Sequence, residues 1–229
     1  MRSRMNHTVS VRAVHAHAAS LVEEHLKIQD HGRKCLASVL INILFFAVGR
    51  MRSIFDACSR LRDAPSDQTV RDALVAMLPE MKPLEQRINA GLSAELPRWL
   101  TKRPQRLAVD LTLIPYRGEP FLDLQEIYRS QPKSGTTHFH AYDSCCVVEH
   151  GQRFTLAIRW VAKDESLKET LQQLLKQVRL LGVSIYFVLL DRKFYSVNVI
   201  RYLQASQTPF LMPVAHRGHK PADPRTSRG

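Results

Sequence analysis

The sequence predicts a mixed α+β or α/β fold in two regions, residues 1–100 and 101–229. In the first region, apolar residues recur three and four positions apart, which is the period of amphipathic helices. From residue 107 onward, short runs rich in β-branched and aromatic residues alternate with turn signals and predict strands. A strongly amphipathic segment then separates the third strand from the fourth, so strands and helices alternate toward the end of the chain.

The overall composition limits the classes of protein to which the chain can belong. Its 229 residues are 45% hydrophobic and 24% charged, which is ordinary for a folded protein. The formal net charge of +12 indicates a polyanionic partner, nucleic acid before an acidic membrane. The longest apolar stretch, residues 35–49, contains Asn42 and is shorter than the roughly 20 residues of a membrane span, so we expect a buried helix. No apolar signal segment follows the basic N-terminus, and the four cysteines lack paired-ligand spacing, which favours a cytoplasmic, reduced chain.

The first region is predicted to be helical throughout. Val14, Leu21, Val22 and Leu26 share one helical face. Further helices are predicted at residues 36–48, 53–61, 67–78 and 84–96.

The helices at 53–61 and 67–78 form a possible helix-turn-helix. Pro65 stops the first helix, and Ser66 or Asp67 caps the second. In a helix-turn-helix the second helix carries the DNA contacts, which here would be Gln68, Thr69 and Arg71, with Asp72 beside them. Plain helical packing explains such a pair equally well, because many helical domains never touch DNA.

Residues 98–106 carry four basic residues and no acidic one, and we interpret them as a linker. Lys102 and Arg103 in such a linker can follow a phosphate backbone. The alternative is a solvated hinge without a partner.

The second region is predicted to contain three successive strands, then a helix, a strand, a helix and a last strand. Ser166 and Glu169 have the spacing of a capping box at the start of the first of these helices, and Gly182 follows its end. The predicted strands are residues 107–116, 137–148, 154–161, 184–190 and 209–214, and the helices are 166–181 and 194–205. Residues 216–229 show no packing pattern.

This order of elements is the topology of the RNase H-like fold, with a mixed sheet. Asp110 ends the apolar run 107–109, and Asp191 ends the apolar run 183–190. The first and fourth strands are neighbours in that fold, so we expect the two aspartates to converge although they lie 81 positions apart. Paired aspartates bind Mg²⁺ or Mn²⁺ well, because hard cations prefer oxygen ligands. Two such ions can activate a water or sugar hydroxyl for in-line attack on a phosphodiester, and a basic chain suits that polyanionic substrate.

Three segments resemble the insertion-sequence transposases of the DDE type. Residues 107–118, LAVDLTLIPYRG, resemble the first catalytic strand of that family, and residues 191–203, DRKFYSVNVIRYL, resemble the block around its second aspartate. Residues 136–142, TTHFHAY, have the family's character as well. The resemblance implies that Asp110 and Asp191 hold the metals, that the N-terminal helices bind the inverted-repeat ends, and that copies of the chain assemble in a transposition complex near the nucleoid.

The resemblance also implies a third carboxylate, a glutamate on a later helix. Past Asp191 the only acidic residue is Asp223, in a Pro-rich terminal tail that offers no helix. We therefore expect a truncated RNase H-like domain with impaired strand transfer. The alternatives are a catalytically inactive DNA-binding fragment that inhibits intact transposase, and an RNase H-like nuclease or resolvase of unrelated role.

Several other residues are of types that can ligate metals or take part in acid–base chemistry. His138, His140, Cys145, Cys146 and His150 suggest zinc, but their spacing matches no common zinc pattern. Asp123 and Glu126 are expected to be solvated, whereas Asp143, in mid-strand, can approach the site. Arg192 and Lys193, beside Asp191, are candidate phosphate contacts.

Overall fold

The structure is a computed structural model that describes residues 9–118, 124–149 and 151–214. The chain divides into two compact units, Met1–Leu96 and Pro97–Gly229, and each is described by itself. Among the described residues, no single helix is long and apolar enough to cross a membrane. Helices α2 (Ala37–Gly49) and α3 (Ile54–Arg60) have the required length and composition only when taken together, and the chain bends by 113° between them.

The first unit consists of helices, as predicted. Ten buried residues from α2, α3, α4 and the loop before α2 form its core, with Leu40, Ile41 and Ile43 of α2 at 0–1% exposure. The apolar stretch that contains Asn42 is therefore a core helix. The helices are α1 (Val11–Leu26), α2 (Ala37–Gly49), α3 (Ile54–Arg60), α4 (Asp67–Met77) and α5 (Met81–Ser93).

The predicted cap of α4 is confirmed. The Ser66 hydroxyl accepts a hydrogen bond from the backbone N–H of Thr69 at 3.2 Å, and Ser53 caps α3 in the same way through the N–H of Asp56 at 3.1 Å. These serines satisfy N–H groups that would otherwise lack a partner at the start of each helix.

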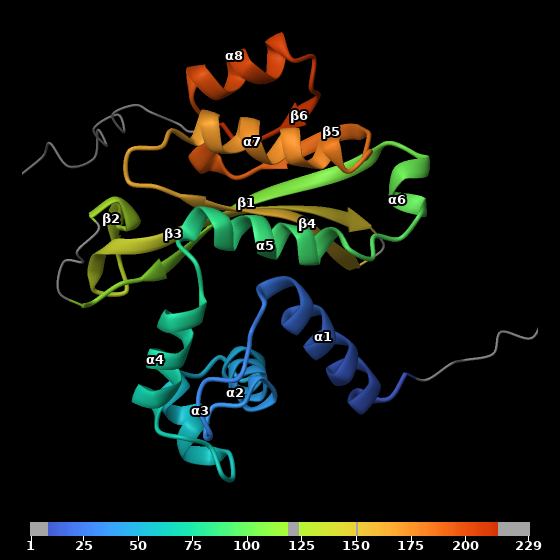
Figure 1. Cartoon of the computed structure of the whole chain (residues 1–229). Coiled ribbons are helices and arrows are strands. Elements are labelled where there is room, and N and C mark those ends of the chain that lie inside the picture. The colour runs from blue at the N-terminus through green and yellow to red at the C-terminus, as the bar shows by residue number, and fades with distance from the viewer. Residues whose placement is uncertain (1–8, 119–123, 150, 215–229) are drawn as a thin grey trace, which may run out of the picture. The chain divides into compact units, whose positions relative to one another are not determined.

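The second unit is built around a mixed sheet with strand order β2-β3-β1-β5-β6, and β4 pairs with β3 (Figure 1). β3 runs antiparallel to β1, β2 and β4, whereas β5 runs parallel to β1 and β6. The predicted RNase H-like topology is confirmed, including the pairing of the first strand with the strand before Asp191. The elements are α6 (Trp99–Lys102), β1 (Gln105–Pro115), η1 (Leu124–Glu126), β2 (Tyr128–Lys133), β3 (Thr136–Glu149), β4 (Gln152–Val161), α7 (Leu167–Leu180), β5 (Ile185–Leu190), η2 (Arg192–Phe194), α8 (Val197–Ala205) and β6 (Phe210–Leu211).

Helices α7 and α8 lie on the same side of this sheet (Figure 1). α7 buries Leu171, Leu174 and Val178 toward β3 and β4, so its apolar stripe forms one layer of the core. The predicted capping box is present, because Ser166 accepts from the N–H of Glu169 while Glu169 accepts from the N–H of Ser166.

The interpretation of residues 98–106 as a linker is wrong. Residues 99–102 form α6, in which Leu100 is fully buried. The buried Gln105 side chain donates from Nε2 to the carbonyl oxygens of Arg103 at 2.9 Å and Leu100 at 3.1 Å. The Gln105 side chain thus links this segment to β1 of the second unit, and the sequence pattern did not single it out.

Two further differences concern strands. β2 was not predicted, because its residues lack alternation, and Pro132 argues against a central strand. It occupies the edge of the sheet, where proline is tolerated. The first strand, β1, begins at Gln105 rather than at residue 107, so Asp110 lies in its middle, and Asp191 follows directly after β5 as expected.

Candidate functional site

The register of β1 against β5 brings the two predicted metal ligands to adjacent strands at one level of the sheet. Val109 lies opposite Leu190 in this parallel pair. The next residues along the two strands are Asp110 and Asp191. Neighbouring strands lie roughly 4.8 Å apart. The register therefore supports the predicted convergence of the two aspartates.

Both aspartates emerge on the side of the sheet away from α7. Val109 and Leu190 are buried at 3% and 5% exposure, and successive side chains of an extended chain point to opposite faces. The backbone at Asp191 is still extended, with φ −68° and ψ 157°. Asp110 and Asp191 are both exposed, so two carboxylates are available to a ligand from solvent. Exposed, adjacent carboxylate oxygens are a donor set that suits Mg²⁺ or Mn²⁺.

A third carboxylate, Asp143 of β3, lies close to this pair but on the buried face. It pairs with Leu111 of β1 and Arg159 of β4 across the antiparallel ladders. It is 0% exposed, and neither carboxyl oxygen has a hydrogen-bond partner within the described part of the chain. Buried carboxyls are normally paired, so Asp143 is the most unusual polar group of this unit.

Burial raises the pKa of Asp143 to about 7. The negative charges of Asp110 and Glu165 act in the same direction, whereas Lys193 and Arg159 oppose the rise. Sequence reasoning gave Asp143 only a minor role. The available signal was its place in the alternation of Phe139, Ala141 and Cys145, all of which are buried.

Arg159 is already engaged by another acid. Its Nε and Nη2 donate to the same Glu165 oxygen, Oε1, at 2.9 and 2.6 Å. Arg159, the cross-strand neighbour of Asp143, thus donates to Glu165, and Asp143 has no hydrogen-bond partner among the described residues.

The basic residues beside Asp191 are presented by a short turn. Arg192 and Lys193 are exposed on η2, and the fully buried Phe194 anchors the turn that carries them. The Lys193 charge acts on Asp143, so this turn lies over the same end of the sheet.

The predicted DNA-contacting residues of α4 engage in local interactions. Gln68 donates to Asp72 at 2.8 Å, and Arg71 pairs with Asp67 at 2.9 Å. The Thr69 hydroxyl lies 2.7 Å from that of Ser66. Gln68 and Arg71 are exposed, and these weak local pairs can be exchanged for a ligand.

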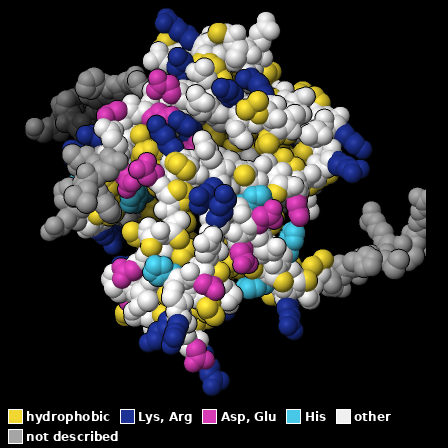
Figure 2. All heavy atoms as spheres, in the orientation of Figure 1, with side chains coloured by type: hydrophobic (Ala, Val, Ile, Leu, Met, Phe, Trp, Pro, Cys, Tyr) yellow, Lys and Arg dark blue, Asp and Glu magenta, His cyan; other side chains and the backbone are white. Residues whose placement is uncertain are grey.

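In the second unit, Lys102 is exposed, and Arg103 forms an ion pair with Glu149 while lying 5.8 Å from the centre of the Trp99 ring. Elsewhere, Lys and Arg side chains occur at several separate places on the visible face of the molecule (Figure 2).

The histidines and cysteines considered for zinc do not form a metal site among the described residues. No group of three or more His, Cys, Asp or Glu side chains in that part of the chain could hold a metal ion. Cys145 and Cys146 are both buried, and burial raises the pKa of the Cys145 thiol. His150 and Asp123 lie outside the described residues, and Glu126 ends the short helix η1.

The strand order, the crossover helices on one face and the paired aspartates define an RNase H-like domain. The model of the family described as "Transposase DDE domain" matches residues 101–228, which is more than half of the chain. The protein belongs to this family of DDE transposases.

Comparison with solved structures gives two transposases as similar chains. One is the piggyBac transposase in a synaptic complex with hairpin DNA, at 12% identity and a TM-score of 0.45, covering 100% of this chain and 48% of that one. The other is the Mos1 transposase in a paired-end complex with the left transposon end, at 13% identity and a TM-score of 0.25, covering 92% of this chain and 61% of that one. The chain thus spans about half to three fifths of the length of these transposases. No curated protein matches the sequence.

Proposed function

We propose that the protein acts in DNA transposition, by metal-dependent cleavage and strand transfer at the inverted-repeat ends of an insertion sequence. The observation that carries the proposal is the parallel pairing of Val109 with Leu190, which supports a joint site of Asp110 and Asp191. A bound Mg²⁺ or Mn²⁺ would supply activation of the attacking oxygen and stabilisation of the leaving oxygen.

The residues around the two aspartates would bind and orient the DNA. Arg192 and Lys193 follow Asp191 on an exposed turn, so a phosphate bound at the carboxylates lies within their reach. Their charge offsets the repulsion between a phosphodiester and the carboxylates. The net charge of +12 supports the same class of partner, since phosphate neutralisation drives DNA binding.

The helical unit would recognise the repeat ends through α4. Gln68, Thr69 and Arg71 are its candidate contacts, with Lys102 and Arg103 as further contacts to phosphate. Pairing two ends in one complex requires more than one copy of the chain, which makes a homo-oligomer part of the proposal. Association with the nucleoid would follow from DNA binding.

The described residues offer two of the three carboxylates that the family resemblance implies. Residues 192–214 contain no aspartate or glutamate. This observation also favours a second function, in which the chain binds element ends as a catalytically inactive DNA-binding protein and inhibits intact transposase through mixed multimers.

Metal binding tests the central proposal. Mn²⁺ binding to the full chain is measured by electron paramagnetic resonance for wild type, Asp110→Asn, Asp191→Asn and the exposed control Asp164→Asn. Each ligand variant should lower Mn²⁺ affinity by at least about 10–100-fold. Removing a group that only hydrogen-bonds to a metal ligand already costs that much, and the loss of a ligand itself should cost no less. Asp164→Asn should bind Mn²⁺ as the wild type does. Unchanged affinity in both ligand variants would refute the site.

Cleavage of duplexes that carry the element's ends separates the two functions. Nicking that needs Mg²⁺ and is lost in Asp110→Asn supports the enzyme. Binding of the same duplexes without nicking, together with inhibition of an intact transposase, supports the inhibitor. Equal binding to duplexes with and without the ends would contradict end recognition in both cases.

A further inference from the structure

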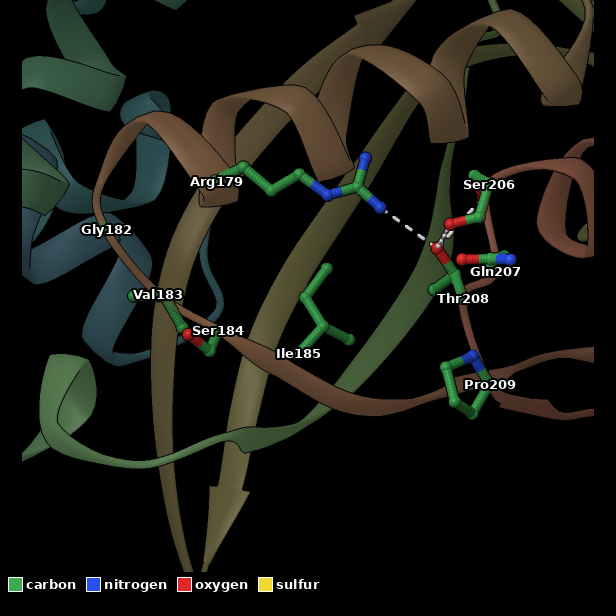
Figure 3. Close-up of a pocket in the computed structure, with 9 residues that line it drawn as sticks. All are labelled: Arg179, Gly182, Val183, Ser184, Ile185, Ser206, Gln207, Thr208 and Pro209. Atoms are coloured by element: carbon green, nitrogen blue, oxygen red, sulfur yellow. Dashed lines mark hydrogen bonds between the residues drawn. The ribbon is translucent and has the colours of Figure 1, made fainter.

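A polar cavity lies at the opposite end of β5 from Asp191 (Figure 3). It is about 470 Å³ in volume and lies between the end of α7, the start of β5 and the turn that joins α8 to β6. Arg179, Ser184, Ser206, Gln207 and Thr208 supply its polar groups. None of the described residues that line the cavity is acidic, and among them Arg179 alone carries a formal charge.

The cationic group of this cavity is held in place from one side. Arg179 extends from the last turn of α7 toward Thr208, and its Nη2 donates to the Thr208 hydroxyl at 2.9 Å (Figure 3). Thr208 is 5% exposed, and its hydroxyl lies 2.9 Å from that of Ser206. The Thr208 hydroxyl therefore orients the guanidinium, and the Ser206 hydroxyl in turn holds that of Thr208.

Most of the hydrogen-bonding capacity of Arg179 is unused. A guanidinium has five N–H donors, and the Thr208 bond takes one of them. Arg179 is exposed, and it has no part in any of the ion pairs formed among the described residues. A planar, oriented and unneutralised guanidinium is the group that proteins use to bind phosphate.

We propose that this cavity binds a phosphate of the DNA backbone, as a contact separate from the metal site. The proposal rests on the proposed function, because that function supplies DNA as the partner. Ser184 and Gln207, both exposed at the rim, can donate to the phosphate oxygens that Arg179 does not reach. The cavity is open to solvent on the side of these residues, which suits one phosphate of a long polymer.

Distance separates this contact from the chemistry. Asp191 lies six positions along the chain from Ile185, the β5 residue that lines the cavity, or about 20 Å away at roughly 3.3 Å per residue. A group so far from Asp191 changes how tightly DNA binds and leaves the chemical step unaffected. Its signature is a change in affinity and salt dependence with unchanged metal binding.

The main test compares Arg179→Gln with Lys176→Gln. Lys176 is an exposed residue on the same helix that does not line the cavity, so it controls for loss of one charge. Affinity for a long duplex is measured as a function of salt. Arg179→Gln should weaken binding about tenfold at low salt and reduce the slope of log affinity against log salt by about 1, the value for one lost phosphate contact. Lys176→Gln should change neither quantity by as much.

Two further variants distinguish binding from a structural role, since Arg179 also joins α7 to the α8–β6 turn. Arg179→Lys keeps the charge and should retain the salt slope with lower affinity. Thr208→Val removes the hydroxyl that orients the guanidinium and should weaken DNA binding less than Arg179→Gln does. Melting temperature is recorded for each. Variants that melt earlier but bind DNA with wild-type affinity and slope would overturn the proposal.

Titration with inorganic phosphate distinguishes a free anion from DNA. If Arg179→Gln abolishes binding of inorganic phosphate while DNA binding is unchanged, the cavity serves a free anion and the proposal is wrong. Failure of the wild-type chain to bind DNA at all would instead remove the proposed function on which this inference rests.

Discussion

Replacement of Asp143 by asparagine should stabilise the second unit, and the gain should grow with pH. The carboxyl is fully buried without a hydrogen bond, and its pKa rises from 3.8 to about 7 in the folded chain. Because the folded state binds this proton more tightly than the unfolded state, Asp143 favours folding only while it stays protonated. Its contribution is complete below about pH 4 and is lost as the pH rises to about 7.

The size of the effect follows from the shift. About three pKa units correspond to about 4 kcal/mol at 1.36 kcal/mol per unit, an upper bound because the site can relax or admit water. Asp143→Asn removes the ionisation and so avoids this cost. The variant should exceed the wild type by up to about 4 kcal/mol at pH 8, by about 2 kcal/mol at pH 5.5, and by almost nothing at pH 4.

Urea unfolding followed by tryptophan fluorescence measures this difference at each pH. The protein has two tryptophans, Trp99 and Trp160, and both lie in the second unit, so the signal reports the unit that contains Asp143. The exposed Asp164→Asn variant serves as control and should show no pH-dependent difference from the wild type. A stability difference independent of pH, or an Asp143→Asn variant less stable than the wild type at pH 8, would show that Asp143 is ionised and paired.

Three further substitutions test the packing of the second unit in the same assay. Ser166→Ala removes the capping box of α7 and should cost about 1 kcal/mol, while leaving the pH dependence set by Asp143 intact. Gln105→Ala should cost about 1–3 kcal/mol and lower the fluorescence change on unfolding, because the carbonyls that it satisfies hold α6 and Trp99. Gly182→Ala should cost about 1 kcal/mol, since Gly182 has φ +75° after α7; no loss would mean that this turn relaxes freely.

Elements with a strong local pattern were predictable from the sequence. The helix now seen at Leu167–Leu180 was expected at 166–181, because capping residues and a terminal glycine mark both of its ends. The pairing of β1 with β5 was expected from the order of elements alone. Elements held by tertiary contacts were not predictable: β2 pairs only with β3, and α6 depends on contacts of Gln105 that lie outside any local period.

In the candidate site, too, the residues with a local sequence pattern were predictable, whereas those that depend on tertiary contacts were not. Asp110 and Asp191 were found because each stands out after an apolar run. The importance of Asp143 could not be read from the sequence, since it depends on Glu165 holding Arg159 and on the depth of burial in the folded sheet. Likewise, the Arg179 cavity joins three segments that only the crossover of α8 brings together.

The β1–β5 pairing has a consequence for how the protein becomes active. The two proposed metal ligands come from strands joined through three intervening strands and a helix, so a newly made chain would have no such metal site until the most non-local step of folding is complete. An ion that binds the native chain then adds its binding energy to the stability of the whole sheet. Substitutions that destabilise the sheet far from the two aspartates should therefore also lower the measured affinity for the cation.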